Sequence, residues 1–488
     1  MDMTVAEREG GSSDEPWELP RGWCWTTIET VAPVNPSTTF EELPADSELS
    51  FVPMAAVSEE TGAINLSARR PVAAVAKGYM RFQQGDVLFA KITPCMENGK
   101  VAPVPELAER FAAGSTEFHV LRPVAVAQRF LWYWLVSRRF RHEAQRNMSG
   151  SAGQLRVPAG FLRESSIPLA PLPEQRRIVE RIDTLFAEIA EGEAALEEAR
   201  RGLETFRRSL LKAAVTGELT RDWRETNKPT ETGHDLLARI RAEREANTSK
   251  GRGKRAQVNE PLDTSELPDL PKGWAWARIG DLFDVSTGST PSRSDPTLWN
   301  GGISWVSSGE VAFCRIRHTK ETISRAGLGN ASTRLHPPGT VLLAMIGEGK
   351  TRGQCAILDV PAANNQNCAA IRVSATPIPP EYIYCVLEQQ YTASRKASQG
   401  GNQPALNAGK VSNIRIPLPP LDEIGAILHV TSELQTAFDD ALTELDKSSL
   451  DAARLRQAIL KSAFEGTLAL QDPHDEPASV LLAKIIAP

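Results

Sequence analysis

The chain has 488 residues, of which 41% are hydrophobic and 24% are charged, and its formal net charge is −6. One hydrophobic core rarely grows beyond about 250–300 residues, so this length predicts at least two domains. No apolar run approaches the ~20 residues that span a bilayer. The negative net charge argues against a protein that coats nucleic acid without sequence preference, because such binding needs many Lys and Arg residues on the phosphates.

The N-terminus, residues 1–16, is acidic and polar and lacks the basic start and apolar stretch of a secretory signal. We therefore expect a disordered end on a cytoplasmic protein. The six cysteines form no Cys-x-x-Cys pair, and the seven histidines are scattered along the chain. This spacing predicts neither a disulfide framework nor a metal site, and we expect no cofactor on this chain.

The first globular part is expected over residues 17–173. It opens on Leu-Pro-Arg-Gly-Trp-Cys-Trp at 19–25, whose alternating Trp23 and Trp25 indicate an early strand in the core. Short apolar runs such as 86–90 follow a glycine, and Pro, Gly, Ser and Asn interrupt them often, which is typical of an irregular α+β domain. The aromatic run 130–136 predicts a buried helix.

The same part contains the first candidates for contact with DNA. Residues 121–167 carry eight arginines against two glutamates. Lys and Arg hold phosphates, whereas Asn, Gln and Arg pair with base edges. The candidates are Lys91, Asn98, Lys100, Arg138, Arg139, Arg141, Gln154 and Arg156. For any single residue, ordinary surface polarity is the competing interpretation, and for the Gly- and Ser-rich loop 149–156 it is a structural turn.

A long helical region is expected over residues 174–224. Apolar residues recur at strict 4-3 spacing, which predicts a coiled-coil seam with breaks at Gly192 and Ala199. The seam consists of Ile178, Ile182, Leu185, Ile189, Leu196, Leu203, Phe206 and Leu210. At ~1.5 Å per residue, the 38 residues 174–211 would be about 57 Å long.

Residues 225–266 are polar and highly charged, with the basic run 249–255 at their centre. We interpret them as a solvated linker; an accessory phosphate contact is the alternative.

The second globular part is expected over residues 267–422, because Leu-Pro-Lys-Gly-Trp-Ala-Trp at 270–276 repeats the opening motif. Residues 300–420 carry twelve Lys and Arg against six acidic residues. Its candidates for DNA contact are Lys350, Arg352, Gln399, Asn402 and Gln403.

The segment 344–351, Ala-Met-Ile-Gly-Glu-Gly-Lys-Thr, satisfies a relaxed phosphate-loop pattern. A phosphate loop needs a helix after it, so that backbone N–H groups at the helix start cradle the phosphates. The following residues 352–358 indicate a turn into another strand, so a Gly-rich turn that places Lys350 and Arg352 near DNA is the favoured interpretation.

The second helical region, with a C-terminal tail, is expected over residues 423–488. An offset of 249 residues maps the first seam onto a second one, with polar or small residues at Thr431, Ala441, Ser448 and Ala452. Its apolar members are Ile427, Leu434, Phe438, Leu445, Leu455 and Ile459. The chain is thus predicted to be an α+β protein with two globular domains in tandem repeat, each followed by a long helix, the two helices pairing as an antiparallel coiled coil.

A rod of this length exceeds one turn of B-DNA, about 34 Å. It is therefore a candidate ruler between two DNA half-sites, and lengthening it at residues 216–219 should widen the gap between them.

The repeated plan resembles the specificity subunit of type I restriction-modification systems. The resemblance rests on the Leu-Pro-x-Gly-Trp-x-Trp openings, on Thr-Gly-Ser-Thr-Pro at 287–291, on Trp-Asn-Gly-Gly-Ile-Ser-Trp-Val at 299–306, on Gly-Asp-Val-Leu at 85–88 and on the Ile-Pro-Leu-x-Pro-Leu-x-Glu hinges at 167–174 and 416–423. It extends from residue 17 to about 486.

This resemblance implies a non-catalytic chain with two target-recognition domains that read a bipartite DNA site. It also implies two adenine methyltransferase subunits and two restriction subunits as partners. S-adenosylmethionine, ATP and magnesium would belong to those partners. Residues 33–36, Pro-Val-Asn-Pro, replace Thr-Gly-Ser-Thr-Pro in the first copy, so the two domains should read different sequences. Ile424 stands where the first copy has Gln175, which leaves the detail of the second hinge open.

Two other functions remain as alternatives. The first is an enzyme that binds nucleotide at residues 344–351 and acts on DNA. The second is a structural coiled-coil adaptor, which would not select DNA by sequence.

Overall fold

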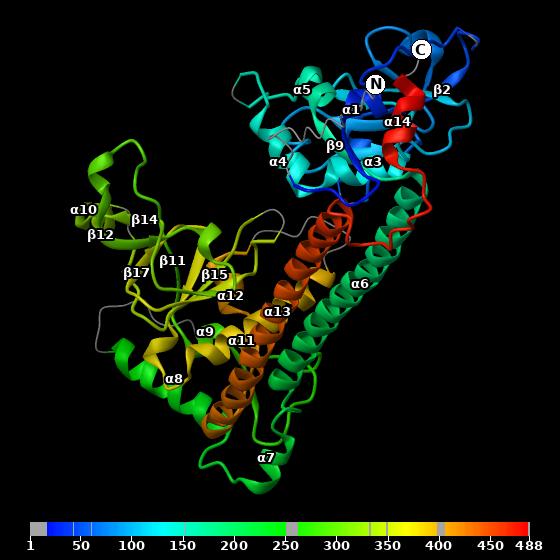
Figure 1. Ribbon diagram of the computed structural model, residues 1–488. Helices are drawn as coiled ribbons and strands as arrows, with labels where there is room; N and C mark the ends of the chain where they lie inside the picture. Colours follow the sequence, from blue (N-terminus) through cyan, green and yellow to red (C-terminus); the bar gives the residue numbers. More distant parts are fainter. Residues whose placement is uncertain are drawn as a thin grey trace, which may run out of the picture. The chain divides into compact units, whose positions relative to one another are not determined.

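A computed structural model describes residues 17–41, 43–59, 61–151, 153–249, 262–330, 333–347, 350–397 and 406–486. The chain divides into two compact units. Unit 1 comprises Met1–Glu197 and Asp446–Pro488, and unit 2 comprises Glu198–Leu445. Each unit thus contains one globular part and segments of both long helices (Figure 1). The N-terminus at 1–16, expected to be disordered, lies outside the described residues.

The globular part of unit 1 is built from two small sheets and a closing pair of strands. One sheet has the order β3-β2-β7-β4, the second has the order β6-β5-β8, and β1 pairs with β9. The elements are β1 (Cys24–Thr27), α1 (Ile28–Val31), β2 (Glu48–Val52), η1 (Met54–Ala56), β3 (Arg69–Pro71), α2 (Val72–Val75), β4 (Met80–Gln83), β5 (Val87–Ala90), β6 (Val101–Pro103), β7 (Phe111–Gly114), β8 (Phe118–Leu121), α3 (Gln128–Val136), α4 (Arg138–Arg146), α5 (Ala159–Glu164) and β9 (Ser166–Leu169).

The globular part of unit 2 follows the same order with a larger sheet. Its sheets are β11-β18-β15-β16-β13 and β14-β12-β17, and β10 pairs with β19. The elements are β10 (Ala275–Arg278), α9 (Ile279–Leu282), β11 (Val285–Thr287), η2 (Pro296–Leu298), β12 (Trp299–Val306), η3 (Ser308–Glu310), β13 (Cys314–Ile316), β14 (Glu321–Ile323), α10 (Arg325–Asn330), β15 (Val341–Ala344), β16 (Cys355–Leu358), β17 (Ala362–Asn364), β18 (Cys368–Ile371), η4 (Val373–Ala375), α11 (Pro380–Ala397), α12 (Ala408–Ser412) and β19 (Arg415–Leu418).

The repeated sequence motifs open and close each globular part. Cys24 lies opposite Leu169 in the antiparallel pair β1–β9, and Ala275 lies opposite Leu418 in the pair β10–β19. Each copy also contains one parallel pair, β2–β7 in unit 1 and β12–β17 in unit 2. The two copies therefore share one fold.

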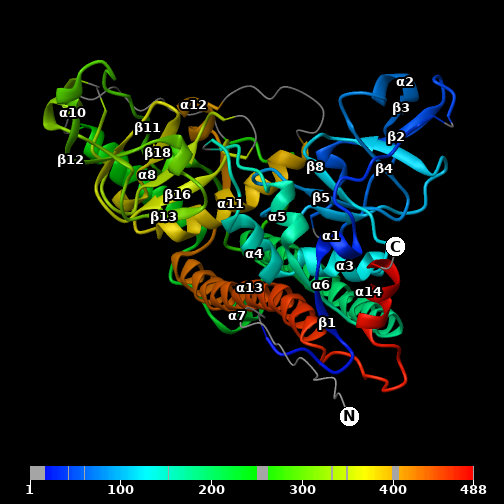
Figure 2. The ribbon, with the colours of Figure 1, turned by 45° about the horizontal axis from the view of Figure 1, so that its top comes forward.

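The two long helices, α6 (Leu172–Thr216) and α13 (Leu421–Phe464), run side by side in opposite directions (Figures 1 and 2). In unit 1 the beginning of α6 meets the end of α13, where Arg456 donates two hydrogen bonds to Glu193, at 2.6 and 2.8 Å. In unit 2 the end of α6 meets the beginning of α13, where Phe206 packs on Phe438 with ring centroids 5.5 Å apart. The predicted α+β fold with an antiparallel helix pair is confirmed.

The predicted seam is buried at some positions and exposed at others. Ile178 and Ile182 belong to the core of unit 1, and Ile427 belongs to that of unit 2. By contrast, Phe206 and Leu455 are exposed although both occupy seam positions. Close two-stranded packing would cover both positions, so their exposure marks places where the two helices do not pack tightly on each other. Among the described residues, no helix is long and apolar enough to cross a membrane.

The tail that follows each long helix packs on the globular part of the other copy. In unit 1, the amide of Ala478 at the start of α14 (Ala478–Ile486) donates to the carbonyl of Gly22 at 2.9 Å. In unit 2, the amide of Gly233 at the start of α8 (Gly233–Ser249) donates to the carbonyl of Gly273 at 2.7 Å. Each unit is therefore completed by chain from both copies.

The expected linker 225–266 is not solvated throughout. After the short helix α7 (Arg221–Thr226), helix α8 buries Leu236, Leu237 and Ile240 in the core of unit 2. The interpretation as a solvated linker is therefore wrong for α8, because three apolar side chains on one face suffice to anchor an otherwise charged helix. Most of the basic run 249–255 lies outside the described residues.

Candidate nucleic-acid interface

Three segments of unit 1 come together beyond the ends of strands β5 and β8. They are the loop 91–100, the turn 115–117 and the loop 149–156, and we call them the three-loop cluster of unit 1. The amide of Lys91 donates to the carbonyl of Glu117 at 2.9 Å, and the amide of Val157 donates to the carbonyl of Lys91 at 2.9 Å. The backbone of Lys91 thus connects all three segments.

Unit 2 repeats this arrangement with different side chains. The amide of Met345 donates to the carbonyl of Asn367 at 2.8 Å, and the amide of Leu406 donates to the carbonyl of Met345 at 3.2 Å. The three-loop cluster of unit 2 therefore combines the described residues 345–347 and 350–354, the turn 365–367 and the chain at Leu406. The predicted residues Gln399, Asn402 and Gln403 lie outside the described residues.

Only some of the predicted residues of unit 1 project from its cluster. Gln154 is exposed and Lys91 is half-buried. Lys100 instead lies 3.6 Å from Glu59 and donates to the carbonyl of Met54, with a largely buried side chain. Asn98 also donates to Glu59, at 3.2 Å. Lys100 and Asn98 therefore fasten the loop 91–100 to the neighbouring η1 region, and their contact with DNA stays a prediction.

The arginines of α4 have structural partners. Arg141 donates to the carbonyls of Val136 and Glu97, and burial lowers its pKa. Arg139 stacks on the ring of Trp17 with its guanidinium carbon 4.5 Å from the ring centroid. Arg138 is exposed, but its amide donates to Gln457 of the rod. Arg141 thus holds the loop 91–100 through Glu97, and the first residue of α4 is bonded to α13 through its backbone.

The remaining described candidates of unit 2 are Lys350, which is exposed, and Arg352, which is half-buried. The carbonyl of Lys350 accepts a hydrogen bond from the hydroxyl of Tyr391 at 2.7 Å, which anchors the loop to α11. The turn 365–367, Asn-Gln-Asn, was not predicted, although a run of amide side chains between two short apolar strands is a readable signal. Thr290 donates to Gln366 of this turn at 2.6 Å.

The Thr-Gly-Ser-Thr-Pro stretch of unit 2 lies against the same turn. The amide of Ser289 donates to the carbonyl of Asn364 at 3.0 Å. A Cβ atom on Gly288 would lie 1.7 Å from that carbonyl oxygen, so the close approach requires glycine. In unit 1, Asn35 takes the corresponding place and bonds Val120 and His119 through its side chain. The two copies thus build this edge of the interface differently.

A nucleotide-binding loop at 344–351 is contradicted. The loop lies between strands β15 and β16, which pair with each other in one antiparallel sheet. Among the described residues of this segment no helix begins, and β16 follows as a strand, so they offer no helix start to cradle phosphates. Within the described parts of the chain, moreover, no group of three or more His, Cys, Asp or Glu residues could hold a metal ion.

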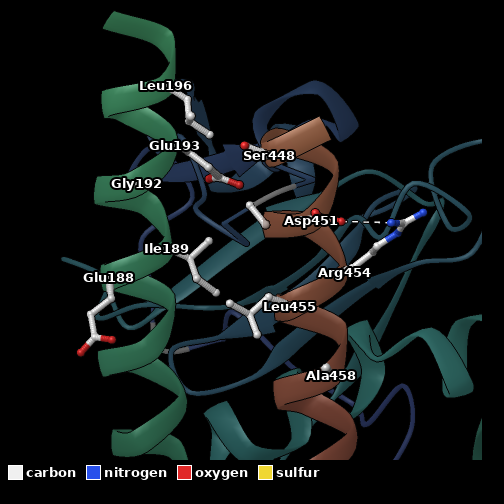
Figure 3. A pocket seen from close by; sticks show the side chains of 11 residues that line it. Glu188, Ile189, Gly192, Glu193, Leu196, Ser448, Asp451, Arg454, Leu455 and Ala458 are labelled. Atoms are coloured by element: carbon white, nitrogen blue, oxygen red, sulfur yellow. Dashed lines mark hydrogen bonds and ion pairs between the residues drawn. The ribbon is translucent and has the colours of Figure 1, made fainter. Parts of the chain in front are cut away.

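The middle of the rod carries an apolar groove of about 780 Å³, entirely within unit 1 (Figure 3). Ile189 of α6 faces Leu455 of α13 across the groove, Leu196 lies farther along α6 near Ser448, and Gly192 supplies no side chain to fill the groove (Figure 3). The remaining lining residues are Glu188, Glu193, Ser448, Asp451, Ala452, Arg454 and Ala458. Two of its bordering carboxylates are already paired, Glu193 with Arg456 and Asp451 with Arg454. An open apolar groove of this kind is suited to a helix with apolar anchors.

Comparisons with known proteins all find type I restriction specificity proteins. A family model described as the type I restriction modification DNA specificity domain matches residues 31–198 and 271–454. The specificity subunit of the type I restriction enzyme EcoAI from Escherichia coli is 30% identical over 324 residues, which cover 57% of this chain and 54% of that protein. The specificity subunit of EcoEI from Escherichia coli is 26% identical over 510 residues, covering 93% of this chain and 84% of that protein.

Two solved structures share the fold. One, described as the structural basis underlying complex assembly and conformational transition of the type I R-M system, has a TM-score of 0.68 at 20% identity and covers 93% of this chain and 100% of its own. The HsdS subunit from Thermoanaerobacter tengcongensis has a TM-score of 0.55 at 21% identity, with the same two coverages.

Proposed function

The chain belongs to the type I restriction modification DNA specificity family, and we propose that it reads the two halves of a split DNA site for partner enzymes. The observation that carries this proposal is the repeated three-loop cluster, in which corresponding backbone hydrogen bonds hold different polar side chains in the two units. The chain itself is the non-catalytic specificity subunit. Adenine methylation and DNA cleavage are then the work of the partners.

Each three-loop cluster reads a few base pairs in the major groove. Amide and guanidinium side chains match the donors and acceptors on base edges there, whereas lysines such as Lys91 and Lys350 hold phosphates. The cluster of unit 1 presents Gln154 and Arg156, and that of unit 2 presents Gln366, the exposed residue of its Asn-Gln-Asn turn. Because these side chains differ, the two half-sites differ in sequence.

The helix pair sets the distance between the half-sites and docks two methyltransferase subunits. The apolar groove beside Gly192 is the docking surface that we assign to a methyltransferase helix. Two restriction subunits complete the complex when cleavage is required. S-adenosylmethionine, ATP and magnesium are bound by these partners, which work with the chain on DNA in the cytoplasm.

The proposal is tested by selecting bound duplexes from a random DNA library with the chain and its cognate methyltransferase. The expected product is one split motif, with two short specified parts around a fixed gap. The complex without this chain serves as the control and should enrich no such motif. Equal enrichment of all sequences by the intact complex would instead support the structural-adaptor alternative.

A further inference from the structure

One charged pair lies inside the three-loop cluster of unit 1. Arg156 donates from Nε and Nη2 to the two carboxylate oxygens of Glu117, both at 2.9 Å. The pair joins the turn 115–117 to the loop 149–156, and 40% of the Arg156 side chain is exposed against 27% for Glu117. The guanidinium is therefore held from one edge while it remains open to solvent.

The remaining donors of Arg156 define what it can bind. Nη1 donates to the carbonyl of Gln154 at 3.3 Å, so three of the five guanidinium N–H groups have partners in the described chain. One N–H on each Nη atom is left. A pair of N–H groups on Nη1 and Nη2 that point outward in the guanidinium plane matches the paired acceptors O6 and N7 that guanine alone presents in the major groove.

The charge of the Arg156–Glu117 pair distinguishes Arg156 from an arginine that binds phosphate. Glu117 neutralises Arg156, and the guanidinium holds the pKa of the Glu117 carboxyl below its ordinary value, so the carboxylate stays charged near neutral pH. A neutral pair adds little to counterion release, which drives sequence-independent binding. In unit 2 the residue at the place of Glu117 is Asn367, so this arrangement is specific to one unit.

We propose that Arg156 reads a guanine in the half-site bound by unit 1 and that Glu117 is the positioning residue that aims its guanidinium at the base. The inference rests on the proposed function and deepens it, because it assigns one base to one unit. A fixed guanidinium loses less conformational freedom on binding than a mobile one, which favours the correct base over its competitors.

The test repeats the library selection with two variants of the full complex. Arg156→Lys keeps the charge but loses the planar fork, and the double variant Glu117→Ala/Arg156→Ala removes both charges together. Both should accept other bases at one guanine position, with discrimination there reduced roughly 5- to 150-fold. The second half-site and the gap should not change. For the double variant, the salt dependence of binding should match that of wild type, because no net charge is removed.

A matched control is the double variant Arg69→Ala/Glu109→Ala. This pair lies in the same unit outside the cluster, with similar side-chain exposures of 36% and 23%, and its loss should leave the motif intact.

Unchanged base selectivity in both Arg156 variants would overturn the assignment of guanine reading to Arg156 and leave the proposed function standing. Uniformly weaker binding with a salt slope reduced by ~0.9 in the double variant would replace it with a phosphate contact. Uniformly weaker binding with a lowered Tm and unaltered base preference would reduce the pair to a structural link. If the wild-type complex itself enriched no motif, the proposed function would be contradicted, and the role of Arg156 would fail with it.

Discussion

Glu174 and Glu423 occupy corresponding places at the start of the two long helices but have different partners. Glu423 is buried and accepts from Arg224 at 2.5 Å, from Thr220 at 2.6 Å and from the indole of Trp274 at 2.8 Å. Glu174 is also buried, but its neighbouring arginine, Arg177, pairs with Asp475. Burial therefore raises the pKa of Glu174.

Substituting these two glutamates should have opposite effects. Glu423→Gln leaves Arg224 partly buried without its carboxylate and should lower the free energy of unfolding by roughly 2 kcal/mol. Glu174→Gln removes a buried charge that has no arginine of its own and should be neutral or stabilising at pH 7.5. Denaturant unfolding of both variants beside wild type measures the difference, and equal losses would contradict this account.

The pH dependence of the Glu174 effect has a defined sign. A carboxyl with a raised pKa in the folded state binds protons more tightly there than in the unfolded chain. Its stabilising contribution is therefore present below the unfolded pKa and is lost as the pH rises through the folded pKa. Glu174→Gln should consequently gain stability relative to wild type as the pH rises from 4 to 8. A constant difference across that range would be inconsistent with the raised pKa.

At the residue scale, the sequence predicted that polar and basic loop residues line the interface, but it did not predict which of them project from the cluster. Gln154 and Arg156 were predicted and lie in the cluster, whereas Arg139 and Arg141 were predicted and instead stack on Trp17 or bond backbone carbonyls. Glu117 was missed, since an acidic residue in a turn gives no sign of its partner 39 positions away. Base-reading residues depend on which loops meet, and that is a property of the tertiary fold.

The hinge difference noted in the sequence has a simple explanation in the structure. Gln175 accepts from the amide of Ala127 at 2.8 Å and donates to the carbonyl of Ala170 at 2.8 Å. In the second copy, Pro379 precedes the corresponding helix and has no N–H group to satisfy. Ile424 can therefore replace the amide side chain and pack in the core of unit 2.

At the scale of elements, the rod should act as a ruler. Helix α6 has 45 residues, about 68 Å at ~1.5 Å per residue, and residues 192 and 452 of the two seams both line the groove. The insertion expected at 216–219 is misplaced, because α6 ends at Thr216 and a Cβ on Gly217 would lie 2.5 Å from Pro271. Lengthening there would break the tail contact and leave the rod unchanged.

One heptad inserted in each helix, after residue 197 and after residue 446, preserves the seam and lengthens the rod by about 10 Å. The gap between half-sites should then widen by about 3 base pairs. Motif mapping by library selection measures the gap. A heptad inserted into α6 alone is the control and should disrupt the pairing; an unchanged gap in the double insertion would refute the ruler.

The docking groove allows a second test at this scale. Leu455 is 51% exposed at its edge, and Leu455→Arg introduces a charge where an apolar anchor should bind. Co-purification of the methyltransferase should fall at least tenfold while the chain stays folded. Val124, which is 55% exposed and lies outside the groove, supplies the matched control Val124→Arg. Equal retention of the methyltransferase by both variants would exclude the groove as its docking surface.

Long periodic elements were predictable and short ones were not. The heptad spacing located both long helices, because period 3.5 over ten positions has no other simple explanation. Helix α8 was missed because its buried residues lie within a strongly charged stretch. The Gly-rich segment 344–351 matched a motif by composition, but its position between two paired strands excludes the function that the motif carries elsewhere.

At the scale of the whole molecule, two copies of one plan form two units that share their helices. The order along the chain predicts two domains followed by two helices, whereas the contacts divide the chain in the middle of both helices. The heptad spacing alone does not predict that each unit contains parts of both helices. This arrangement follows from the tails, since Ala478 and Gly233 bond the opening motifs of the opposite copies. Each helix therefore has one half in each unit.

Base-resolution mapping of methyladenine tests the central claim most directly. DNA would be compared from cells carrying this chain with its cognate methyltransferase and from cells carrying the methyltransferase alone. The account predicts one split motif, with two short specified parts around a fixed gap, that disappears without the chain. Methylation at the same positions in both strains, or at no defined motif despite an assembled complex, would contradict the assignment of sequence reading to this protein.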